Sequence, residues 1–313
     1  MPGVKRRLKN VSKLALRKLF EQGQRFGFDV LPCHFYSEIP AIRELRSSAH
    51  WKVPYSMMGV SGADIHSQLN FVKECCPPPI IEEIKTKDIH ARASKRNGEE
   101  GFGPVEADFL YAFVATKRPK QIFQIGCGVS TAVCLLAAEY AGYTPEVICV
   151  EPYPTSYLVQ EANQGRITLI RQKVQLLDLK VVETPTLNDN VLFFVDSTHT
   201  LGPAGEVSRI ILEMLPRLKA GAWVHFHDIK FPYDYDRHIL DSTLFFQHES
   251  VLLHAFLSYN SRFRILASLS MLHYLSPEVL AQYLPNYQPA ENDEGLNKGE
   301  GHFPSSTYLE VVG

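Results

Sequence analysis

QIFQIGCGVSTA, residues 121–132, decides the fold of this chain of 313 residues. An apolar stretch runs into Gly126 and Gly128 and then into a segment with the composition of a helix. Glycines at a strand-to-helix turn let a ligand approach the backbone, and the first N–H groups of the helix are free to bind it. The third glycine of the dinucleotide fingerprint is missing, because Thr131 stands in its place. The pattern predicts a ligand-binding turn, with an ordinary turn capped by Ser130 or Thr131 as the alternative.

Short apolar strands alternate with helices on both sides of this turn. Such alternation is typical of a doubly wound α/β fold, in which a mostly parallel sheet is covered by helices on both faces. The final residues, 305–312, have the composition of a strand and are expected to return as an antiparallel edge strand. The expected strands are 121–126, 146–151, 167–171, 191–196, 222–228 and 263–271, and the expected helices are 105–117, 131–142, 155–163, 205–219 and 243–258.

Composition divides the chain into three expected parts. Residues 1–25 form a basic amphipathic segment, residues 26–103 a cap of helices and loops that contacts the substrate, and residues 104–313 the ligand-binding domain. Within the last part, residues 276–304 are polar and rich in Pro, Asn and Gly, which predicts a surface insertion.

The charge is distributed unevenly along the chain. The net charge is −2, but residues 1–20 hold seven basic side chains and no acid, so the remainder is acidic. An acidic body does not suit nucleic acid, and no nucleic-acid partner is expected. The basic segment has apolar residues at helical spacing, so it is interpreted either as a solvated terminal helix or as a contact with an anionic membrane surface.

The location of the protein is predicted from its apolar runs and its cysteines. The apolar runs are too short to span a bilayer, and the N-terminus lacks the pattern of a secretory signal. The six cysteines show neither metal-binding nor disulfide-framework spacing. We therefore expect a cytoplasmic protein, either free or peripheral at the inner face of the membrane.

Three further strands end in polar side chains. EVICVE ends in Glu151, an acid that can accept both hydroxyls of a ribose. VLFFVD ends in Asp196, with His199 on the following loop, and AWVHFHD ends in His227 and Asp228. Because the carboxyl ends of parallel strands face one crevice, the two aspartates can share Mg²⁺ or Mn²⁺ if their strands are neighbours. The alternative is that one aspartate caps a helix and no metal binds.

The three histidines near these strand ends are expected to differ in role. His225 and His227 alternate along one strand and so share a face, whereas Asp228 points to the other. His225 is interpreted as a core histidine, and His227 lies close enough to the strand end to reach the site. His199, on a loop, is the better position for a general base with a pKa near neutrality.

The motifs in combination resemble a known family. QIGCGVST, VEPYP, VDSTH and HFHDI follow one another in this order, with HFYSEIP (34–40) before them and HESVLLHAFLSYNSRF (248–263) after them. In this order they resemble the class I S-adenosylmethionine-dependent methyltransferases, and among these the bacterial subgroup grouped as methyltransferase family 24. The resemblance covers about residues 30–275 and implies a Rossmann-like methyltransferase fold with S-adenosylmethionine as cofactor.

The resemblance also implies roles for individual residues. The glycine turn would hold the methionine part of the cofactor, the acid after the second strand the ribose, and in cation-dependent relatives the acids after the fourth and fifth strands a metal. One position departs from the family, because Gln124 stands where an acid usually faces the cofactor ammonium. The expected cofactor-binding residues are Gln124, Gly126, Gly128, Ser130, Thr131, Glu151 and Asp196, and the expected metal ligands are Asp196, His227 and Asp228.

The sequence therefore predicts a methyltransferase that acts on a hydroxyl of a small molecule or glycan precursor, with His199 and Asp196 as catalytic residues and Mg²⁺ or Mn²⁺ as a second cofactor to be tested. Two other interpretations stay open. One is an NAD(P)-dependent oxidoreductase, and the other is a non-catalytic binding or scaffold protein that retains the fold. The acceptor, the choice between O- and N-methylation, and whether the chain forms a homo-oligomer are not determined by the sequence.

Overall fold

The computed structural model describes residues 15–31, 33–35, 37, 39–183, 190–241, 244–289 and 303–313. The chain divides into two compact units, residues 1–51 and 52–313. In the first unit, residues 15–25 are helical and α2 (Ile42–Ser47) follows. The first fourteen residues of the predicted basic segment lie outside the described residues. No helix in the described part of the chain is long and apolar enough to cross a membrane.

The second unit is built on a seven-stranded sheet of order β3-β2-β1-β4-β5-β7-β6. The pairs from β3 to β5 are parallel, and β7 is antiparallel to both of its neighbours. This confirms the predicted doubly wound, mostly parallel α/β fold. The strands are β1 (Gln121–Ile125), β2 (Glu146–Val150), β3 (Thr168–Ile170), β4 (Val191–Val195), β5 (Trp223–Phe226), β6 (Phe263–Ser268) and β7 (Thr307–Val311).

The last strand is antiparallel as predicted, but its predicted place at the edge of the sheet is wrong. It lies between β5 and β6, opposite Trp223 on one side and Phe263 on the other. Its residues Tyr308, Leu309 and Val311 are buried. An apolar strand buried on both faces belongs inside a sheet, where both of its edges are paired.

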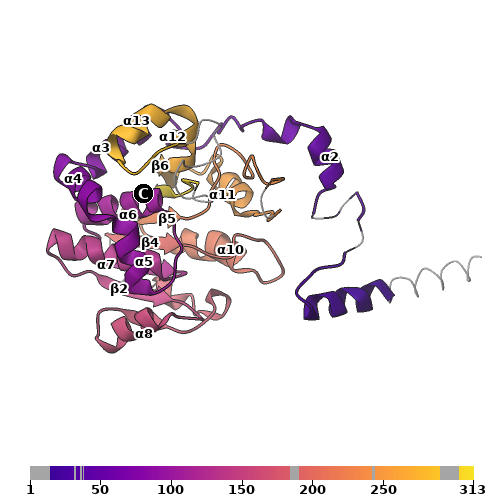
Figure 1. The fold of residues 1–313 in the computed structure, drawn as a ribbon, viewed down its shortest axis with the longest axis horizontal. Coiled ribbons are helices and arrows are strands. Elements are labelled where there is room, and N and C mark those ends of the chain that lie inside the picture. Colours follow the sequence, from indigo (N-terminus) through magenta and orange to yellow (C-terminus); the bar gives the residue numbers. More distant parts are fainter. Residues whose placement is uncertain are drawn as a thin grey trace, which may run out of the picture. The chain divides into compact units, whose positions relative to one another are not determined.

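Two layers of helices cover the two faces of the sheet (Figure 1). Side chains alternate between the layers along each strand, so Ile122 packs with the first layer and Phe123 with the second. The first layer contains α3 (Ile65–Cys75), α4 (Pro78–Lys87), α5 (Ile89–Asn97), α6 (Pro104–Lys117), α7 (Val129–Ala141) and α8 (Ser156–Asn163), and the second contains α10 (Glu206–Arg209) and α11 (Glu249–Leu257). Further short helices are η2 (Val174–Leu176), α9 (Lys180–Glu183), α12 (Leu269–Leu275) and α13 (Pro277–Tyr283).

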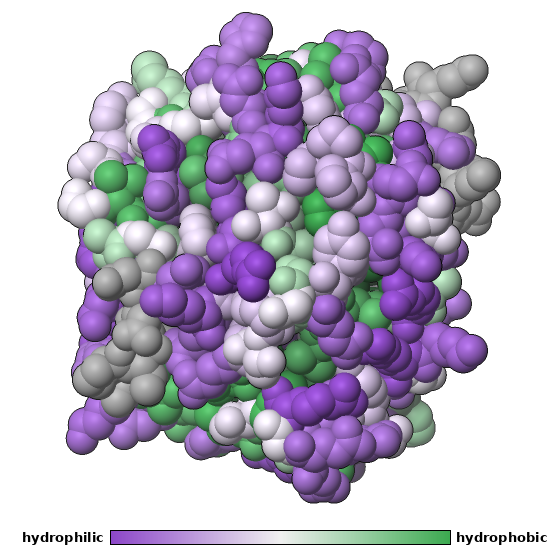
Figure 2. All heavy atoms as spheres, turned by 90° about the vertical axis from the view of Figure 1, so that its left-hand side faces the viewer, coloured by the Kyte–Doolittle hydropathy of each residue, from purple (hydrophilic) through white to green (hydrophobic). Residues whose placement is uncertain are grey.

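Helices from the predicted cap belong to the first layer. Ile84 of α4 and Ala93 of α5 share one hydrophobic core with Phe109 and Val114 of α6. Figure 2 shows the molecule from the side of this layer, with a mainly hydrophilic surface and small hydrophobic areas between the polar side chains. The boundary predicted after residue 103 therefore does not coincide with the observed division after Trp51. A role of this region in contacting an acceptor stays a prediction.

Two predicted helices differ in extent from the observed ones. The segment 205–219 forms α10, a π-helical turn (Ile210–Met214) and a 3-10 turn (Leu215–Arg217), because Pro216 has no backbone N–H to continue the α-helical ladder. The helix expected from residue 243 begins only at Glu249.

Candidate active site

The turn after β1 joins the ends of three strands. The φ of Gly126 is +78°, a conformation that favours glycine, and a Cβ there would lie 1.8 Å from the carbonyl oxygen of Asp196. Gly126 N–H donates to the carbonyl of Val150, and Asp196 N–H donates to that of Ile125. This close approach explains why the sequence has glycine at this position.

Glu151 stands beside this turn. Its Oε2 accepts a hydrogen bond from Cys127 N at 3.3 Å, and its Oε1 accepts one from Tyr153 N at 2.9 Å. Together with Gly126 and Asp196 it lines a cavity of about 330 Å³, which lies within the size range of small-molecule sites. The polar lining is completed by Lys173, Gln175, Ser197, Thr198 and Glu206.

Three of the predicted cofactor residues lie beneath the turn, not in the cavity. Gln124, Ser130 and Thr131 are buried. Gln124 Nε2 donates to Ser130 Oγ at 3.5 Å, and Thr131 Oγ1 accepts from Gly128 N at 3.3 Å. These side chains hold the shape of the turn from below. Cofactor binding by these three residues and by Gly128 stays a prediction.

His199 lies at the centre of a cluster of carboxylates. Its Nδ1 is 2.7 Å from Oε2 of Glu249, and its Nε2 is 3.5 Å from Oδ1 of Asp196 and 3.5 Å from Oδ2 of Asp228. Its side chain is 9% exposed, and that of Glu249 is fully buried. The φ of His199 is +59°, an uncommon conformation that concentrates at functional sites. The structure thus places the predicted base between the two predicted strand-end acids.

His225 in β5 and His227 just after it face the first helical layer. Both His225 and His227 lie against the ring of Phe102, as expected for residues on one face. His225 Nε2 lies 3.0 Å from Ser306 Oγ, and the side chain is fully buried, which agrees with the predicted core histidine. His227 Nδ1 lies 3.2 Å from Oε1 of Glu106, so it contacts a buried acid.

The carboxylate of Asp228 has partners on both oxygens. Oδ1 accepts hydrogen bonds from Lys230 Nζ and Ser305 Oγ, each at 2.9 Å. Oδ2 accepts one from Gln247 Nε2 at 3.3 Å and also faces His199. The φ of Asp228 is +58°, so two of the clustered residues occupy the left-handed region.

The charges of the cluster shift the pKa of its members. Burial by itself would lower the pKa of His199, but the hydrogen bonds to Asp196 and Glu249 raise it to about 9. Burial also opposes the charged form of His227, yet Glu106, Asp196 and Asp228 raise its pKa to about 10. The predicted pKa near neutrality for His199 is therefore wrong, because sequence alone did not show the buried carboxylates around it.

The predicted metal site is not supported. In the part of the chain that the structure describes, no group of three or more His, Cys, Asp or Glu side chains is arranged to hold a metal ion. Lys230 occupies the position beside Asp228, and His227 faces Glu106. Since these residues do not fit a divalent cation, no metal ion takes part in the mechanism proposed below.

Four residues of the cluster were not singled out from the sequence. They come from α6, α11, the loop after β5 and the segment before β7, which are far apart in the chain. A usable signal was an acid inside an otherwise apolar helix, since buried acids need a partner. The four residues are Glu106, Lys230, Glu249 and Ser305.

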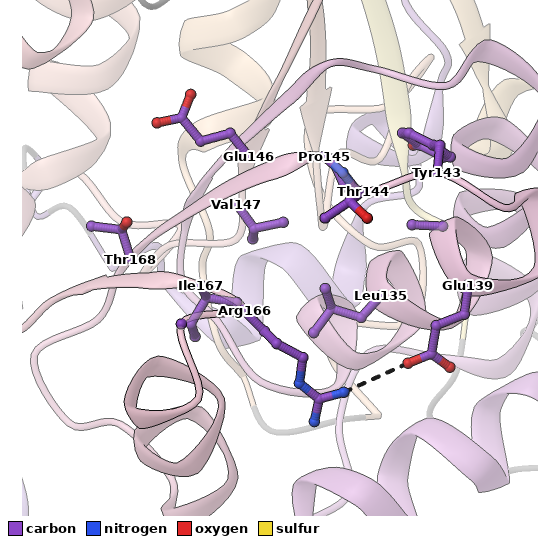
Figure 3. A pocket seen from close by; sticks show the side chains of 12 residues that line it. Leu135, Glu139, Tyr143, Thr144, Pro145, Glu146, Val147, Arg166, Ile167 and Thr168 are labelled. Atoms are coloured by element: carbon purple, nitrogen blue, oxygen red, sulfur yellow. Dashed lines mark ion pairs between the residues drawn. The ribbon is translucent and has the colours of Figure 1, made fainter.

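A second cavity, of about 340 Å³, lies at the amino ends of the strands, where β2 and β3 begin (Figure 3). Arg166 points across it toward Glu139, with 3.8 Å between Nη1 and Oε1. Arg166 also pairs with Glu161, and Glu139 with Arg96. This cavity is separated from the strand ends that carry the cluster, and its charges neutralise one another.

Comparison with known families shows which family model this domain matches. Residues 123–229, about a third of the chain, match the model of methyltransferase family 24, described as a methyltransferase domain. The matched segment runs from β1 past Asp228 and contains both the glycine turn and His199. This match confirms the resemblance drawn from the sequence, and S-adenosylmethionine-dependent methyltransferase activity is supported.

The individual proteins that match this chain share less than a third of its sequence. An uncharacterised protein of Archaeoglobus fulgidus is 29% identical over 190 residues, which are 57% of this chain and 80% of the relative. One match is the methyltransferase PaMTH1 of Podospora anserina, solved with S-adenosylhomocysteine (SAH). The match covers 91% of this chain and 100% of the PaMTH1 chain, with 13% identity and a TM-score of 0.41. The match to the plantazolicin methyltransferase BpumL, also solved with SAH, covers 79% of this chain and 98% of the BpumL chain, with 11% identity and a TM-score of 0.41.

Proposed function

We propose that the protein transfers the methyl group of S-adenosylmethionine to a hydroxyl oxygen of a small molecule or glycan precursor, with His199 as the general base. The observation that carries this proposal is the buried His199–Glu249 pair, in which the second histidine nitrogen, Nε2, faces Asp196 and Asp228 at the carboxyl ends of β4 and β5. A histidine oriented by a buried carboxylate is a common arrangement for proton abstraction.

The cofactor is proposed to occupy the cavity beside the glycine turn. Glu151 would accept the ribose hydroxyls, because its carboxylate already lines this cavity at the end of β2. Gly126 would allow the methionine part to approach the backbone, and Asp196 would lie between the cofactor and His199. This geometry would place the methyl donor and the base on adjacent strand ends.

S-adenosylmethionine supplies an electrophilic methyl group on a positively charged sulfur. The chain must orient the acceptor oxygen in line with the carbon–sulfur bond and remove the hydroxyl proton as the oxygen–carbon bond forms. Because Glu249 faces Nδ1, the proton would move to Nε2 of His199. The carbon–sulfur electron pair stays on sulfur, which leaves as the neutral thioether SAH.

The raised pKa of His199 sets the pH at which it can accept a proton. With a pKa of about 9, the imidazole is mostly protonated at neutral pH. A bound sulfonium adds a like charge nearby and would lower this pKa. Turnover is therefore expected to rise as the pH increases from 7 toward 9.

A neutral amine does not need this base, because its lone pair is free to attack. The need for His199 therefore distinguishes O-methylation from N-methylation. The test incubates the protein with methyl-labelled S-adenosylmethionine and a panel of nucleotide sugars and phenols, with amino sugars and anilines as matched amine acceptors. Label on the hydroxyl acceptors, lost in His199→Gln, supports the proposal. Label on the amines alone, unaffected by that change, would contradict it.

Cofactor binding is tested separately by calorimetry with SAH and with NADPH. Binding of SAH alone supports the proposed donor. Binding of NADPH alone would favour the oxidoreductase interpretation, and binding of SAH without transfer to any acceptor of the panel would favour the scaffold interpretation.

A further inference from the structure

Lys230 adds a fixed positive charge to the cluster at the ends of β4 and β5. The cluster holds the carboxylates of Glu106, Asp196, Asp228 and Glu249, which face His199, His227 and Lys230. Lys230 is the only one of the three bases that carries its charge at every ordinary pH.

The position of the Lys230 ammonium is defined by contacts on several sides. Nζ donates to Asp228 Oδ1 at 2.9 Å, and the side chain is 12% exposed. The ammonium lies 5.6 Å from the ring centroid of Phe303, within the range of a cation–π interaction. The backbone N–H of Lys230 donates to Ser250 Oγ at 2.9 Å, which fixes the start of the side chain.

This ammonium occupies the place that a divalent cation would need. A metal bound to Asp228 would require at least one carboxylate oxygen, but Oδ1 already accepts from Lys230 and from Ser305. The other oxygen accepts from Gln247 and faces His199. A dication at either oxygen would therefore lie close to a cation already held there and would be repelled by it.

We infer that the ammonium of Lys230, and not a metal ion, supplies the positive charge opposite Asp228, so that this chain binds no Mg²⁺ or Mn²⁺ at the ends of β4 and β5. The binding part of this inference is independent of the proposed function. Its consequence for the reaction, that methyl transfer needs no divalent cation, rests on the proposed function.

The test measures Mn²⁺ binding directly, by the electron paramagnetic resonance signal of free Mn²⁺ titrated with the full-length protein. The wild-type protein is expected to leave the signal unchanged. Lys230→Ala removes the ammonium and leaves Asp228 Oδ1 with the neutral Ser305 hydroxyl as its remaining donor, so the affinity for Mn²⁺ is expected to rise by about tenfold or more. Lys230→Arg keeps the charge and is expected to behave like the wild type.

Two further variants make the result specific. Adding Asp228→Asn to Lys230→Ala is expected to abolish the gained Mn²⁺ binding, since the carboxylate is then lost. Stoichiometric Mn²⁺ binding by the wild type that is lost in Asp228→Asn would overturn the inference. Failure of Lys230→Ala to gain any Mn²⁺ binding would also overturn it, provided that SAH binding or an unchanged circular dichroism spectrum shows the variant to be folded.

Turnover with and without chelator then tests the consequence. Turnover unchanged by a chelator supports a reaction that needs no divalent cation, whereas turnover lost with chelator and restored by Mg²⁺ would contradict it. A wild type that fails to bind SAH would refute the proposed function, while the Mn²⁺ titrations would still decide the role of Lys230.

Discussion

The glycine turn after β1 and the histidine–carboxylate cluster after β4 and β5 lie along one edge of the sheet, yet they are held by different means. The turn is fixed mainly by backbone contacts, such as the close approach of Gly126 to Asp196, with support from the buried hydrogen bond between Gln124 and Ser130. The cluster is fixed by side chains such as Glu249 and Lys230, which come from separate parts of the chain. Backbone contacts survive most substitutions, whereas a network of buried charges fails when one partner is removed.

This difference predicts that the two regions can be disturbed independently. Changes in the cluster should act on turnover and on pH dependence, and changes at the turn should act on cofactor affinity. Variants that affect both properties equally would show that the two regions form one functional unit.

The largest expected effect is that of His199→Gln. Glutamine keeps a polar group but cannot accept the proton, so turnover should fall by ~10²–10⁴ and the rise in turnover with pH should disappear. Affinity for SAH should stay within about twofold, because the cavity beside the turn does not need the imidazole. Methyl-transfer rates between pH 6 and 10 measure the first quantity, and calorimetry the second. His66→Gln, an exposed histidine on α3, is the matched control and should behave like the wild type.

The same histidine should make the stability of the protein depend on pH. Its pKa is about 9 in the folded state against an ordinary value of 6.5, so the folded state binds the proton more tightly. The free energy of unfolding should therefore be highest below pH 6.5 and fall by roughly 1–3 kcal/mol as the pH rises through 9. His227 acts in the same direction, whereas Asp228 and Lys230 titrate outside this window. Urea unfolding between pH 6 and 9 measures the slope, which should be shallower in His199→Gln; an equal slope in both proteins would contradict the assignment.

The two regions also differ in how far sequence predicts them. Gly126, Glu151 and Asp196 each end or follow an apolar strand, and the rule that parallel strands end at one edge brings them together without knowledge of distant contacts. Glu249 and Lys230 carry no such local mark, because burial and pairing depend on which segments fold against each other. The same reason explains the errors over β7 and over the pKa of His199.

At the turn, Glu151→Ala should weaken SAH binding by roughly 2 kcal/mol, or about thirtyfold, since hydrogen bonds to a charged acceptor are lost. Turnover at saturating cofactor should change little, because the cluster stays intact. Glu146→Ala, at the opposite end of β2, is the matched control and should leave SAH affinity unchanged. Calorimetry distinguishes the two, and equal affinities in both variants would remove Glu151 from the cofactor site.

The smallest effect on binding is expected for Gln124→Glu, which restores the acid that the family usually has. The side chain of Gln124 is fully buried below the turn, where Nε2 donates to Ser130 Oγ. A carboxylate there replaces a donor with a charge, so the free protein should lose about 1–3 kcal/mol of stability at neutral pH. SAH affinity should rise slightly or stay level, because the ammonium of a bound cofactor would partly offset the buried charge. Thermal unfolding with and without SAH measures both quantities, and Gln124→Met separates the lost hydrogen bond from the added charge. A tenfold fall in affinity for Gln124→Glu, but not for Gln124→Met, would show that the turn has adapted to a neutral amide, and the turn would then depend on its buried side chains in the way the cluster does.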